Sequence, residues 1–434
     1  MQIGVIQSVR VPRVVHTSRS FETVETALLA PVSLLGVDFE LTEEQRLIRR
    51  QIRELCSDFG DEYWREKDRA HEFGWEFFDA FAEGGWCGVT IPEEYGGEGY
   101  GVQEASIVQQ EIARSGAAMA GTSITSHHVF SAAPLVTFGS EDHKERYLPD
   151  IASGEVMVCT GVTEPNSGLD TSRTETTAER TDDGGGDEYV VSGQKIWTSK
   201  AQEADVIMLL ARTAPREEAV ESGKSRFDGL SLFFTAFNAD MDGIEVSEIP
   251  KAGRGAADSN EVWFEDFRVP AADRIGEAGD GFRYLMAFAN AERISLAANA
   301  VGLGQAAIDK AADYANERVV FDAPIGSYQA IQHPLAESWC RLTQDELLIR
   351  KAAWLFDRDE DCSAEANAAK LTASEDALQA CEQAVRTHGG MGYAREYDVE
   401  RYWREAMINV LAPVSNEMVR NHVAQHVLSL PRSY

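Results

Sequence analysis

A glutamate, Glu292, stands inside the stretch FANAERISLAANAVG (residues 288–302), which otherwise consists mostly of small and apolar residues. A helix turns by about 100° per residue, which places this glutamate on one stripe with Leu285, Leu296 and Leu303. The opposite face carries small and apolar side chains, so we expect a helix buried on two sides. A buried carboxylate is costly unless it is paired. It is therefore either half of a structural ion pair with an arginine of a neighbouring helix, or a general base whose pKa is raised by burial.

Two segments upstream hold residue types that suit a bound cofactor. The stretch TGVTEPNSGLDTSRTETTAER (residues 160–180) has the proline, serine and glycine of turns, so it is either a plain loop or part of a binding site. In QKIWTSKAQEADV (residues 194–206), Trp197 stands beside Thr198 and Ser199 at the end of an expected strand. A tryptophan there usually belongs to the core, but one with hydroxyl neighbours also suits a flat aromatic cofactor.

Two segments nearer the C-terminus could contact a ligand. Arg318 ends a helical pattern, where it could bind a phosphate through two hydrogen bonds or form a surface ion pair. The stretch HGGMGYAREYDVERYWREA (residues 388–406) has three glycines around Met391. Adjacent glycines allow a backbone to approach a ligand closely, although a turn between two helices is the alternative.

The overall charge excludes two classes of partner. The 434 residues include 72 acidic against 40 basic residues, and the formal net charge is −32. Such a surface repels nucleic acid and anionic membranes, so we expect neither as a partner. No run approaches the roughly 18 uncharged residues that a membrane span needs. Acidity through almost the whole chain is typical of a protein from a high-salt cytoplasm, where ions screen like charges; an ordinary acidic enzyme is the alternative.

Cysteine and histidine spacing points away from metal and disulfide chemistry. The six cysteines lie far apart without a C-x-x-C pair, so we expect reduced, mostly buried thiols in a cytoplasmic protein. The nine histidines have no metal-ligand spacing, so no metal site is expected. Neither a G-x-G-x-x-G segment after a strand nor a G-x-x-x-x-G-K-[ST] segment occurs, so those nucleotide-binding devices are not indicated.

The elements that must position these residues change character twice along the chain. The stretch LTEEQRLIRRQIRELCSDF (residues 41–59) predicts a helix that begins with a capping box of Thr42 and Gln45. Helical patterns resume after a glycine-rich loop and continue to about residue 152. A β-rich region follows, in which YVVSGQKIWTS predicts a hairpin that turns at Ser192-Gly193. Further predicted strands are ADVIMLLART, LSLFFTAF, GIEVSEIP and EVWFEDFRVP. Long helical patterns return from Gly281, and this α, β, α order argues against a doubly wound fold.

These changes divide the chain into three predicted domains. We expect an N-terminal helical domain at residues 38–155, a middle antiparallel β domain at residues 156–271 and a C-terminal helical domain at residues 272–434. Residues 1–37 lack the acidic bias of the rest. We interpret them as a flexible extension or a start site assigned too early, with an arginine-bearing transit peptide as the alternative.

Seven segments, taken in order, make the chain resemble the acyl-CoA dehydrogenase family over about residues 38–434. They are LTEEQ, GVTIPEEYGGEG, TGVTEPNSGLD, GQKIWTSKAQEAD, VWFEDFRVP, ERVVFDAPIGSYQAIQ and HGGMGYAREYDVERYWREA. The resemblance implies an α+β multidomain fold: an N-terminal all-α domain, a middle antiparallel β-barrel-like domain and a C-terminal four-helix bundle. It also implies FAD bound without a Rossmann domain, usually in a homotetramer built as a dimer of dimers.

The resemblance further implies a reaction and its partners. The substrate is an acyl-CoA thioester, which is dehydrogenated to a trans-2-enoyl-CoA as a hydride passes to flavin N5, in fatty-acid or branched-chain acyl catabolism. An electron-transferring flavoprotein is the implied electron acceptor.

Site residues follow position by position from the matching segments. Those that match the family's flavin-ring site are Thr160, Val162, Thr163, Trp197, Ser199 and Ser415. Those that match its contacts to the adenine-dinucleotide half, which in the family cross a dimer, are Arg318, Phe321, Gln329, Arg386, Gly389 and Gly390. Those that match substrate-binding positions are Leu169, Asn290 and Arg293.

Four positions depart from the family pattern. Arg386 replaces a usual glutamine, Asp322 a usual glycine, Leu169 a serine near the thioester, and Pro413 the glutamate that is the catalytic base in many members. Proline also lacks the backbone N–H that helps polarise the thioester carbonyl, and losing one such donor typically costs about 3 kcal/mol of transition-state stabilisation. In the isovaleryl-CoA and long-chain branches, the base is the residue before the channel arginine, which here is Glu292.

The sequence therefore predicts an FAD-dependent acyl-CoA dehydrogenase with Glu292 as the base. An acyl-CoA oxidase or flavin monooxygenase of the same fold is one alternative. A non-catalytic subunit that binds flavin or acyl-CoA is the other. A base on the helix frees space near Ala412 and Pro413, which is compatible with branched or long acyl groups.

Overall fold

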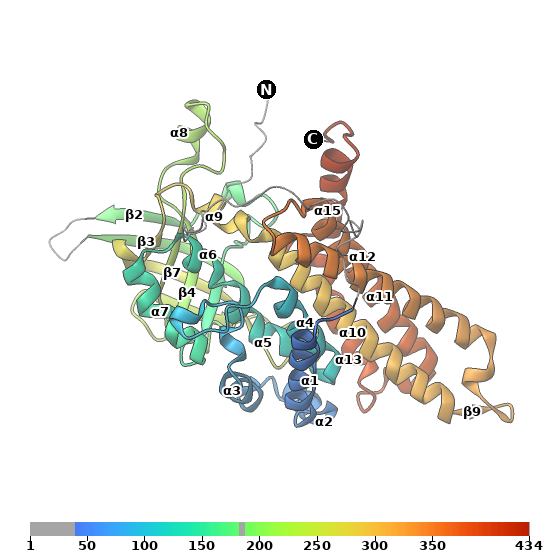
Figure 1. Ribbon diagram of the computed structural model, residues 1–434. Helices are drawn as coiled ribbons and strands as arrows, with labels where there is room; N and C mark the ends of the chain where they lie inside the picture. Colours follow the sequence, from blue (N-terminus) through green and yellow to red (C-terminus); the bar gives the residue numbers. More distant parts are fainter. Residues whose placement is uncertain (1–39, 182–186, 434) are drawn as a thin grey trace, which may run out of the picture.

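The computed structural model of the protein describes residues 40–181 and 187–433, apart from the side chains of residues 127–129. The predicted extension at residues 1–37 lies outside these residues. The described chain has three parts in the predicted order, and Figure 1 shows the sheet at one end of the molecule and the long C-terminal helices at the other. The predicted fold class is confirmed.

The N-terminal part is helical. Its helices are α1 (Glu43–Ser57), α2 (Asp61–Ala70), α3 (Trp75–Glu83), α4 (Val102–Ile112), α5 (Ala118–Phe130), α6 (Ala133–Phe138) and α7 (Glu141–Ser153). The predicted capping box at α1 is present: Gln45 N donates to Thr42 Oγ1 (3.1 Å), and Thr42 N donates to Gln45 Oε1 (3.2 Å). Edge-to-face aromatic contacts between Trp64 and Phe77 join α2 to α3 in the core of this part.

The middle part is one eight-stranded sheet. Its strands are β1 (Val158–Gly161), β2 (Thr177–Thr181), β3 (Glu188–Ser199), β4 (Val206–Arg212), β5 (Leu230–Ala236), β6 (Ile244–Glu248), β7 (Ser259–Pro270) and β8 (Arg274–Ile275). Helix α8 (Arg216–Glu221) lies between β4 and β5 in the sequence. The order is β6-β7-β3-β2-β4-β5-β8, with β1 beside β4. Most pairs are antiparallel as predicted, while β1 and β2 each pair with β4 in parallel.

The predicted hairpin at Ser192-Gly193 is wrong. Strand β3 continues through this position, and its register with β7 shifts between Val191 and Gly193, which is a β-bulge. Strand β2 is its hairpin partner instead, with Thr177 opposite Ser192. Gly193 has a φ of +149°, and a Cβ there would lie 2.6 Å from Thr176 Cα. A bulge and a turn need the same residue type, so the local pattern does not separate them.

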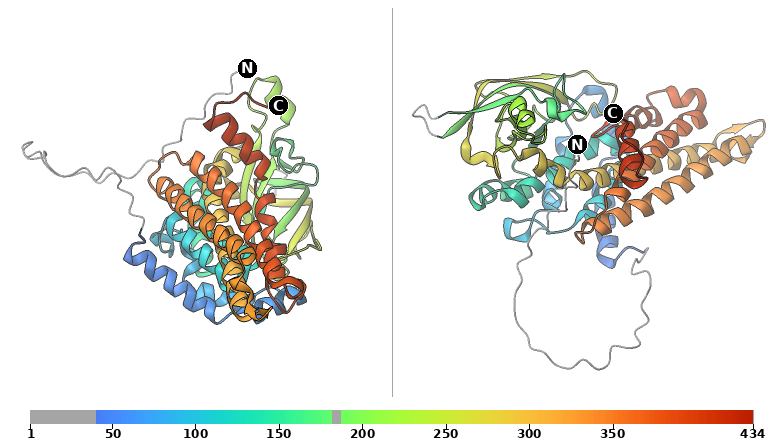
Figure 2. Two further views of the ribbon diagram at one scale, coloured as in Figure 1. Left: turned by 90° about the vertical axis from the view of Figure 1, so that its right-hand side faces the viewer. Right: turned by 90° about the horizontal axis from the view of Figure 1, so that it is seen from above.

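The C-terminal part is helical. Its helices are α9 (Gly281–Ala287), α10 (Ala289–Glu317), α11 (Gln329–Phe356), α12 (Ser363–His388), α13 (Val399–Ala406), α14 (Ile408–Leu411) and α15 (Asn416–His422). The longest, α10, α11 and α12, pack against one another and run side by side in both views of Figure 2. A small hairpin, β9 (Val319–Val320) and β10 (Ala323–Pro324), connects α10 to α11.

The helix predicted around Glu292 is interrupted. Phe288, with φ −106° and ψ 2°, ends α9 and precedes α10, so Leu285 does not share a helix with Glu292. The expected burial of the opposite face holds for Ala291 and Ile294 within α10, but the expected burial of Glu292 itself is wrong, because this residue is exposed.

Two further predictions concern the whole chain. All six cysteines are free, and five are buried while Cys340 is exposed, which confirms the expectation of mostly buried thiols. Among the described helices, none combines the length and the apolar character that crossing a membrane requires.

Candidate active site

Glu292 lies in the first turn of α10, where its backbone N–H donates to Phe288 O (3.1 Å). Within the described residues its carboxylate makes neither a hydrogen bond nor an ion pair, so the structural ion pair with a neighbouring helix is not found there. Its side chain is exposed to solvent, yet desolvation by the surrounding protein raises its pKa, against the opposing effect of Arg293. The carboxylate is therefore reachable by water although the surrounding protein disfavours its charged form.

Arg293, the next residue, also lacks a strong partner. Its Nη1 donates to Asn290 Oδ1 over a long 3.4 Å, and its Nε is buried without a hydrogen bond in the described part of the chain. Burial lowers the pKa of this guanidinium, and Glu292 opposes that shift. The two substrate-binding residues predicted on α10 therefore lie together, with hydrogen-bond donors that a ligand can use.

The loop that carries Pro413 follows α14, which packs against α10. Lys370 of α12 is fully buried below this loop, and its Nζ donates to Val414 O (2.7 Å) and to Asn416 Oδ1 (2.6 Å). Ser415, between these two acceptors, is the N-cap of α15 and accepts from Met418 N. The lysine thus fixes both neighbours of the predicted flavin-site serine.

Trp197 lies at the C-terminal end of β3 with its side chain 54% exposed and its backbone at φ +64°. Ile196 N donates to Thr163 O (2.9 Å), which places Thr163 next to this indole. The hydroxyl of Thr198 is buried without a hydrogen-bond partner. The hydroxyls of Thr163 and Ser199 also have no partner within the described ranges. The structure therefore brings an exposed aromatic face close to the hydroxyl-bearing residues Thr163 and Ser199, while the hydroxyl of Thr198 is buried away from it.

The other residues predicted around the flavin ring and the thioester are close to this group in sequence. Thr160 in β1 shares a hydrogen bond with Ser131 Oγ (2.9 Å), so its hydroxyl is already engaged. Val162 O accepts from Lys195 Nζ (3.2 Å). Leu169 is 56% exposed on the loop between β1 and β2.

The residues predicted to hold the adenine-dinucleotide half lie far from Glu292 in the same chain. Arg318 is the C-cap of α10, whereas Glu292 is in its first turn. At about 1.5 Å per residue the two are about 39 Å apart. Figure 1 places β9 at the tip of the molecule, away from the sheet that carries Trp197.

That tip is an open surface in the single chain. Phe321 is 90% exposed, and it and Asp322 both have positive φ, +51° and +64°. The usual glycine at position 322 fits this left-handed backbone, which aspartate also tolerates. Gly389 has φ +60°, and a Cβ on it or on Gly390 would meet no atom within 4 Å.

The remaining predicted residues at this end are exposed. Gln329 is the first residue of α11. Arg386 donates to Glu382 Oε1 from both Nε (2.8 Å) and Nη2 (2.6 Å), one turn earlier on α12. None of these residues is brought to Trp197 within one chain.

Sequence inspection missed the buried ionic groups that support the site: Glu164, Lys195 and Lys370. Lys195 occupies an inward position of β3, in phase with buried Tyr189 and Val191. Lys370 lies on the alanine stripe of α12 that includes Ala366 and Ala373. A charged residue in phase with buried ones is the signal that identified Glu292, and it would have identified both lysines.

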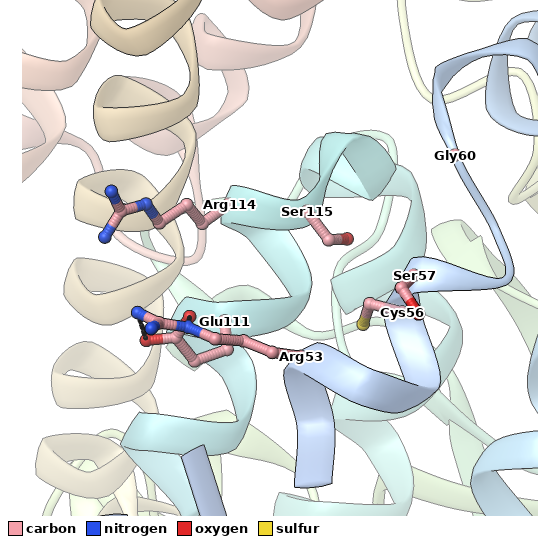
Figure 3. A pocket seen from close by; sticks show the side chains of 7 residues that line it. All are labelled: Arg53, Cys56, Ser57, Gly60, Glu111, Arg114 and Ser115. Carbon is pink, nitrogen blue, oxygen red and sulfur yellow. Dashed lines mark hydrogen bonds and ion pairs between the residues drawn. The ribbon is translucent and has the colours of Figure 1, made fainter. Parts of the chain in front are cut away.

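A pocket elsewhere on the surface offers no comparable chemistry. Figure 3 shows it between α1 and the end of α4, with the Arg53 guanidinium against Glu111. Arg53 donates to both Glu111 oxygens (2.7 and 3.1 Å), and Arg114 is paired with Asp309 (2.9 Å). Because the Arg53, Glu111 and Arg114 side chains of this pocket are already paired, we assign the pocket no role.

The described chain thus combines a helical part, a sheet and a second helical part, and it carries an exposed indole on the sheet and, on α10, a carboxylate without a partner in the described residues. The chain belongs to the acyl-CoA dehydrogenase family. It matches the family's N-terminal domain over residues 42–155, its middle domain over residues 159–267 and its C-terminal domain over residues 279–428.

Relatives match over most of their length. The chain is 34% identical to acyl-CoA dehydrogenase fadE12 of Mycobacterium bovis over 403 residues, which covers 92% of this chain and 100% of the relative. It is 32% identical to acryloyl-CoA reductase (NADH) of Anaerotignum propionicum, covering 90% of this chain and 96% of that protein. The solved structure of butyryl-CoA dehydrogenase from Megasphaera elsdenii superposes with a TM-score of 0.83 at 28% identity, covering 90% of this chain and 100% of that one.

Members of the family bind FAD, and the residues described above fit that group. The exposed face of Trp197 suits a flat ring system, and the hydroxyls of Thr163 and Ser199, which have no partner in the described residues, suit its polar edge.

Proposed function

We propose that this chain dehydrogenates acyl-CoA thioesters to trans-2-enoyl-CoA and that Glu292 is the base that takes the Cα proton. The observation that carries the proposal is the state of Glu292, a carboxylate without a partner in the described residues, reachable by solvent and raised in pKa. A raised pKa makes a carboxylate a stronger proton acceptor. Bound FAD would accept the hydride from Cβ.

Other residues of the site bind and orient in this proposal. Asn290 and Arg293 would contact the acyl-CoA, since Arg293 keeps free donors one residue from the base. Pro413 has no N–H, so the thioester carbonyl must be polarised by other donors than the loop position used in much of the family. Lys370 keeps that loop in place by binding Val414 O and the Asn416 side chain.

The base is tested by anaerobic mixing of the Glu292→Gln protein with acyl-CoA, followed by flavin absorbance. General-base catalysis is worth about 10²- to 10⁴-fold, so we expect the rate of flavin bleaching to fall by that factor. Glu337→Gln, an exposed carboxylate on α11, is the matched control and should bleach at the wild-type rate. Full-speed bleaching in the Glu292→Gln protein would remove Glu292 from this role.

We also propose that the complete site is formed by two copies of the chain. Glu292 and Arg318, the proposed base and a residue predicted to hold the dinucleotide half, lie at opposite ends of α10, about 39 Å apart. In a homodimer, the β9–β10 tip of one copy can lie against the flavin-ring residues of the other, so that both sets of predicted residues contact one FAD. Two such dimers would form the tetramer. Analytical ultracentrifugation of the holoprotein tests this, and a monomer with full FAD content would contradict it.

A second candidate is the reductive direction of the same reaction, because one relative is an acryloyl-CoA reductase. Glu292 in its protonated form would then give a proton to Cα. Anaerobic incubation with an enoyl-CoA and NADH separates the dehydrogenase from the reductase. Oxidation of NADH with the enoyl-CoA as the electron acceptor indicates a reductase.

The electron acceptor and acyl group complete the proposal. We propose an electron-transferring flavoprotein as acceptor in the cytoplasm, and its reduction during acyl-CoA turnover tests this. Peroxide formation at the turnover rate would favour an oxidase or monooxygenase instead. Ligand binding without flavin reduction would favour a non-catalytic subunit.

A panel of straight and branched acyl-CoA thioesters at high salt, scored by flavin bleaching, identifies the substrate.

A further inference from the structure

A buried ion pair lies beneath the flavin-ring residues. Lys195 of β3 and Glu164, just after β1, pair at 2.7 Å with side chains 0% and 4% exposed. Side chains of Ile207 and Leu209 flank the same position at Gly161. Two charges in such surroundings pay a large desolvation cost, and replacing such pairs by apolar residues is often neutral or stabilising. Stability alone therefore gives no reason for this pair.

The hydrogen bonds of Glu164 close the loop that carries Leu169. Its carboxylate accepts from Glu175 N (2.6 Å) and Thr176 N (3.0 Å), at the far end of that loop. Glu164 itself stands at the near end, so one side chain holds both ends of the loop together. The exposed Leu169 is presented from the segment between them.

Lys195 connects the same loop to the strand that carries Trp197. Its Nζ donates to Val162 O (3.2 Å) as well as to Glu164. The next residue, Ile196, donates its N–H to Thr163 O, so the two residues directly before Trp197 both bind the Val162-Thr163 segment. The separation between Thr163 and the indole is therefore set by the Ile196 hydrogen bond together with the contacts of Lys195 to Val162 and Glu164.

We propose that Glu164 and Lys195 are positioning residues that fix three parts of the flavin and thioester site relative to one another. These parts are the Val162-Thr163 backbone, the Trp197 indole and the loop that presents Leu169. The role rests on the proposed function, because it assumes that FAD binds against Trp197.

A double variant separates positioning from stability. Lys195→Met or Glu164→Gln alone leaves one charge buried without its partner, which destabilises the fold. The double variant Lys195→Met/Glu164→Gln has no unpaired charge, so its melting temperature should recover toward the wild-type value. If the pair positions the site, FAD release on dilution of the double-variant holoprotein should still be at least 10-fold faster, and KM for acyl-CoA should rise more than kcat falls.

Arg65→Met/Asp398→Asn is the control, because it removes a partly buried ion pair (2.9 Å) between α2 and the N-cap of α13 that contacts none of the predicted site residues, and the new asparagine can still accept the hydrogen bond from Arg401. Its FAD release should equal that of the wild type. Lys195→Arg is a second variant, which keeps the charge with a bulkier group. It should retain stability and release FAD at least 3-fold faster.

The outcomes distinguish the two proposals. A wild-type protein that carries no FAD would overturn the proposed function, and this inference with it. A wild-type protein that holds FAD, beside double-variant and Lys195→Arg proteins with unchanged FAD release and KM, would overturn only the positioning role.

Discussion

Replacing Lys370 by methionine should change protein stability in a way that depends on pH. Burial, with a smaller contribution from Arg293, lowers the pKa of Lys370 from 10.5 to about 8, while Glu417 and Glu375 act in the opposite direction. Between pH 8 and 10.5 the unfolded chain therefore keeps this proton and the folded chain has lost it. Because the unfolded state binds more protons there, the wild-type free energy of unfolding rises with pH.

The magnitude follows from the same shift. One pKa unit corresponds to about 1.4 kcal/mol, so Lys370 adds on the order of 3 kcal/mol of stability between pH 8 and 10.5. The methionine variant loses two hydrogen bonds at every pH, to Val414 O and Asn416 Oδ1. At pH 7 it also escapes the cost of burying a charge, which offsets much of that loss. The variant should therefore be close to the wild type at pH 7 and clearly less stable at pH 10.

Urea unfolding of both proteins at half-unit steps from pH 7 to 10 measures this difference. Other buried lysines titrate equally in both proteins, so the subtraction isolates Lys370. Lys351→Met, an exposed lysine paired with Glu365 (2.9 Å), is the control and should give a constant difference. A constant difference for Lys370→Met would refute the reasoning.

Three further changes test the site and the fold. Adding Pro413→Glu to the Glu292→Gln protein should restore flavin bleaching at least 10-fold, because it returns a carboxylate to the loop position that many family members use; stopped-flow absorbance measures this. Trp197→Ala should weaken FAD binding about 10-fold in a fluorescence titration, since an aromatic stack contributes up to about 1.5 kcal/mol. Gly193→Ala places a Cβ 2.6 Å from Thr176 Cα and should lower the melting temperature by about 2 °C, for a cost of about 2 kcal/mol, in thermal unfolding.

Sequence patterns predicted the elements well where one face of the element is buried. The helix after Thr42 and strand β7 bury one face, β4 and β5 are apolar and buried along almost their whole length, and all four form as predicted; β6 also forms as predicted, although none of its residues is buried. The turn at Ser192-Gly193 was wrong because glycine serves a bulge as well as a hairpin. The true partner of β3, Thr177–Thr181, is a polar segment whose pairing depends on tertiary contacts.

For the site, the pattern identified Glu292 but not its surroundings. The break at Phe288 leaves no mark in the composition, because phenylalanine is not a helix breaker and the change is set by packing. The separation between Glu292 and Arg318 follows from the unbroken length of α10, which no single sequence motif encodes. The supporting ion pair of Glu164 and Lys195 depends on strand pairing across 31 residues of sequence.

The length of α10 has a consequence for genetics. If each site combines Glu292 of one copy with Arg318 of the other, two different inactive chains can restore activity together. In a mixed dimer of Glu292→Gln and Arg318→Ala chains, one site collects both defects and the other collects none. Random pairing of the two chains should then yield about a quarter of wild-type activity, although neither chain alone is active. Defects at the same end of α10 would not complement each other.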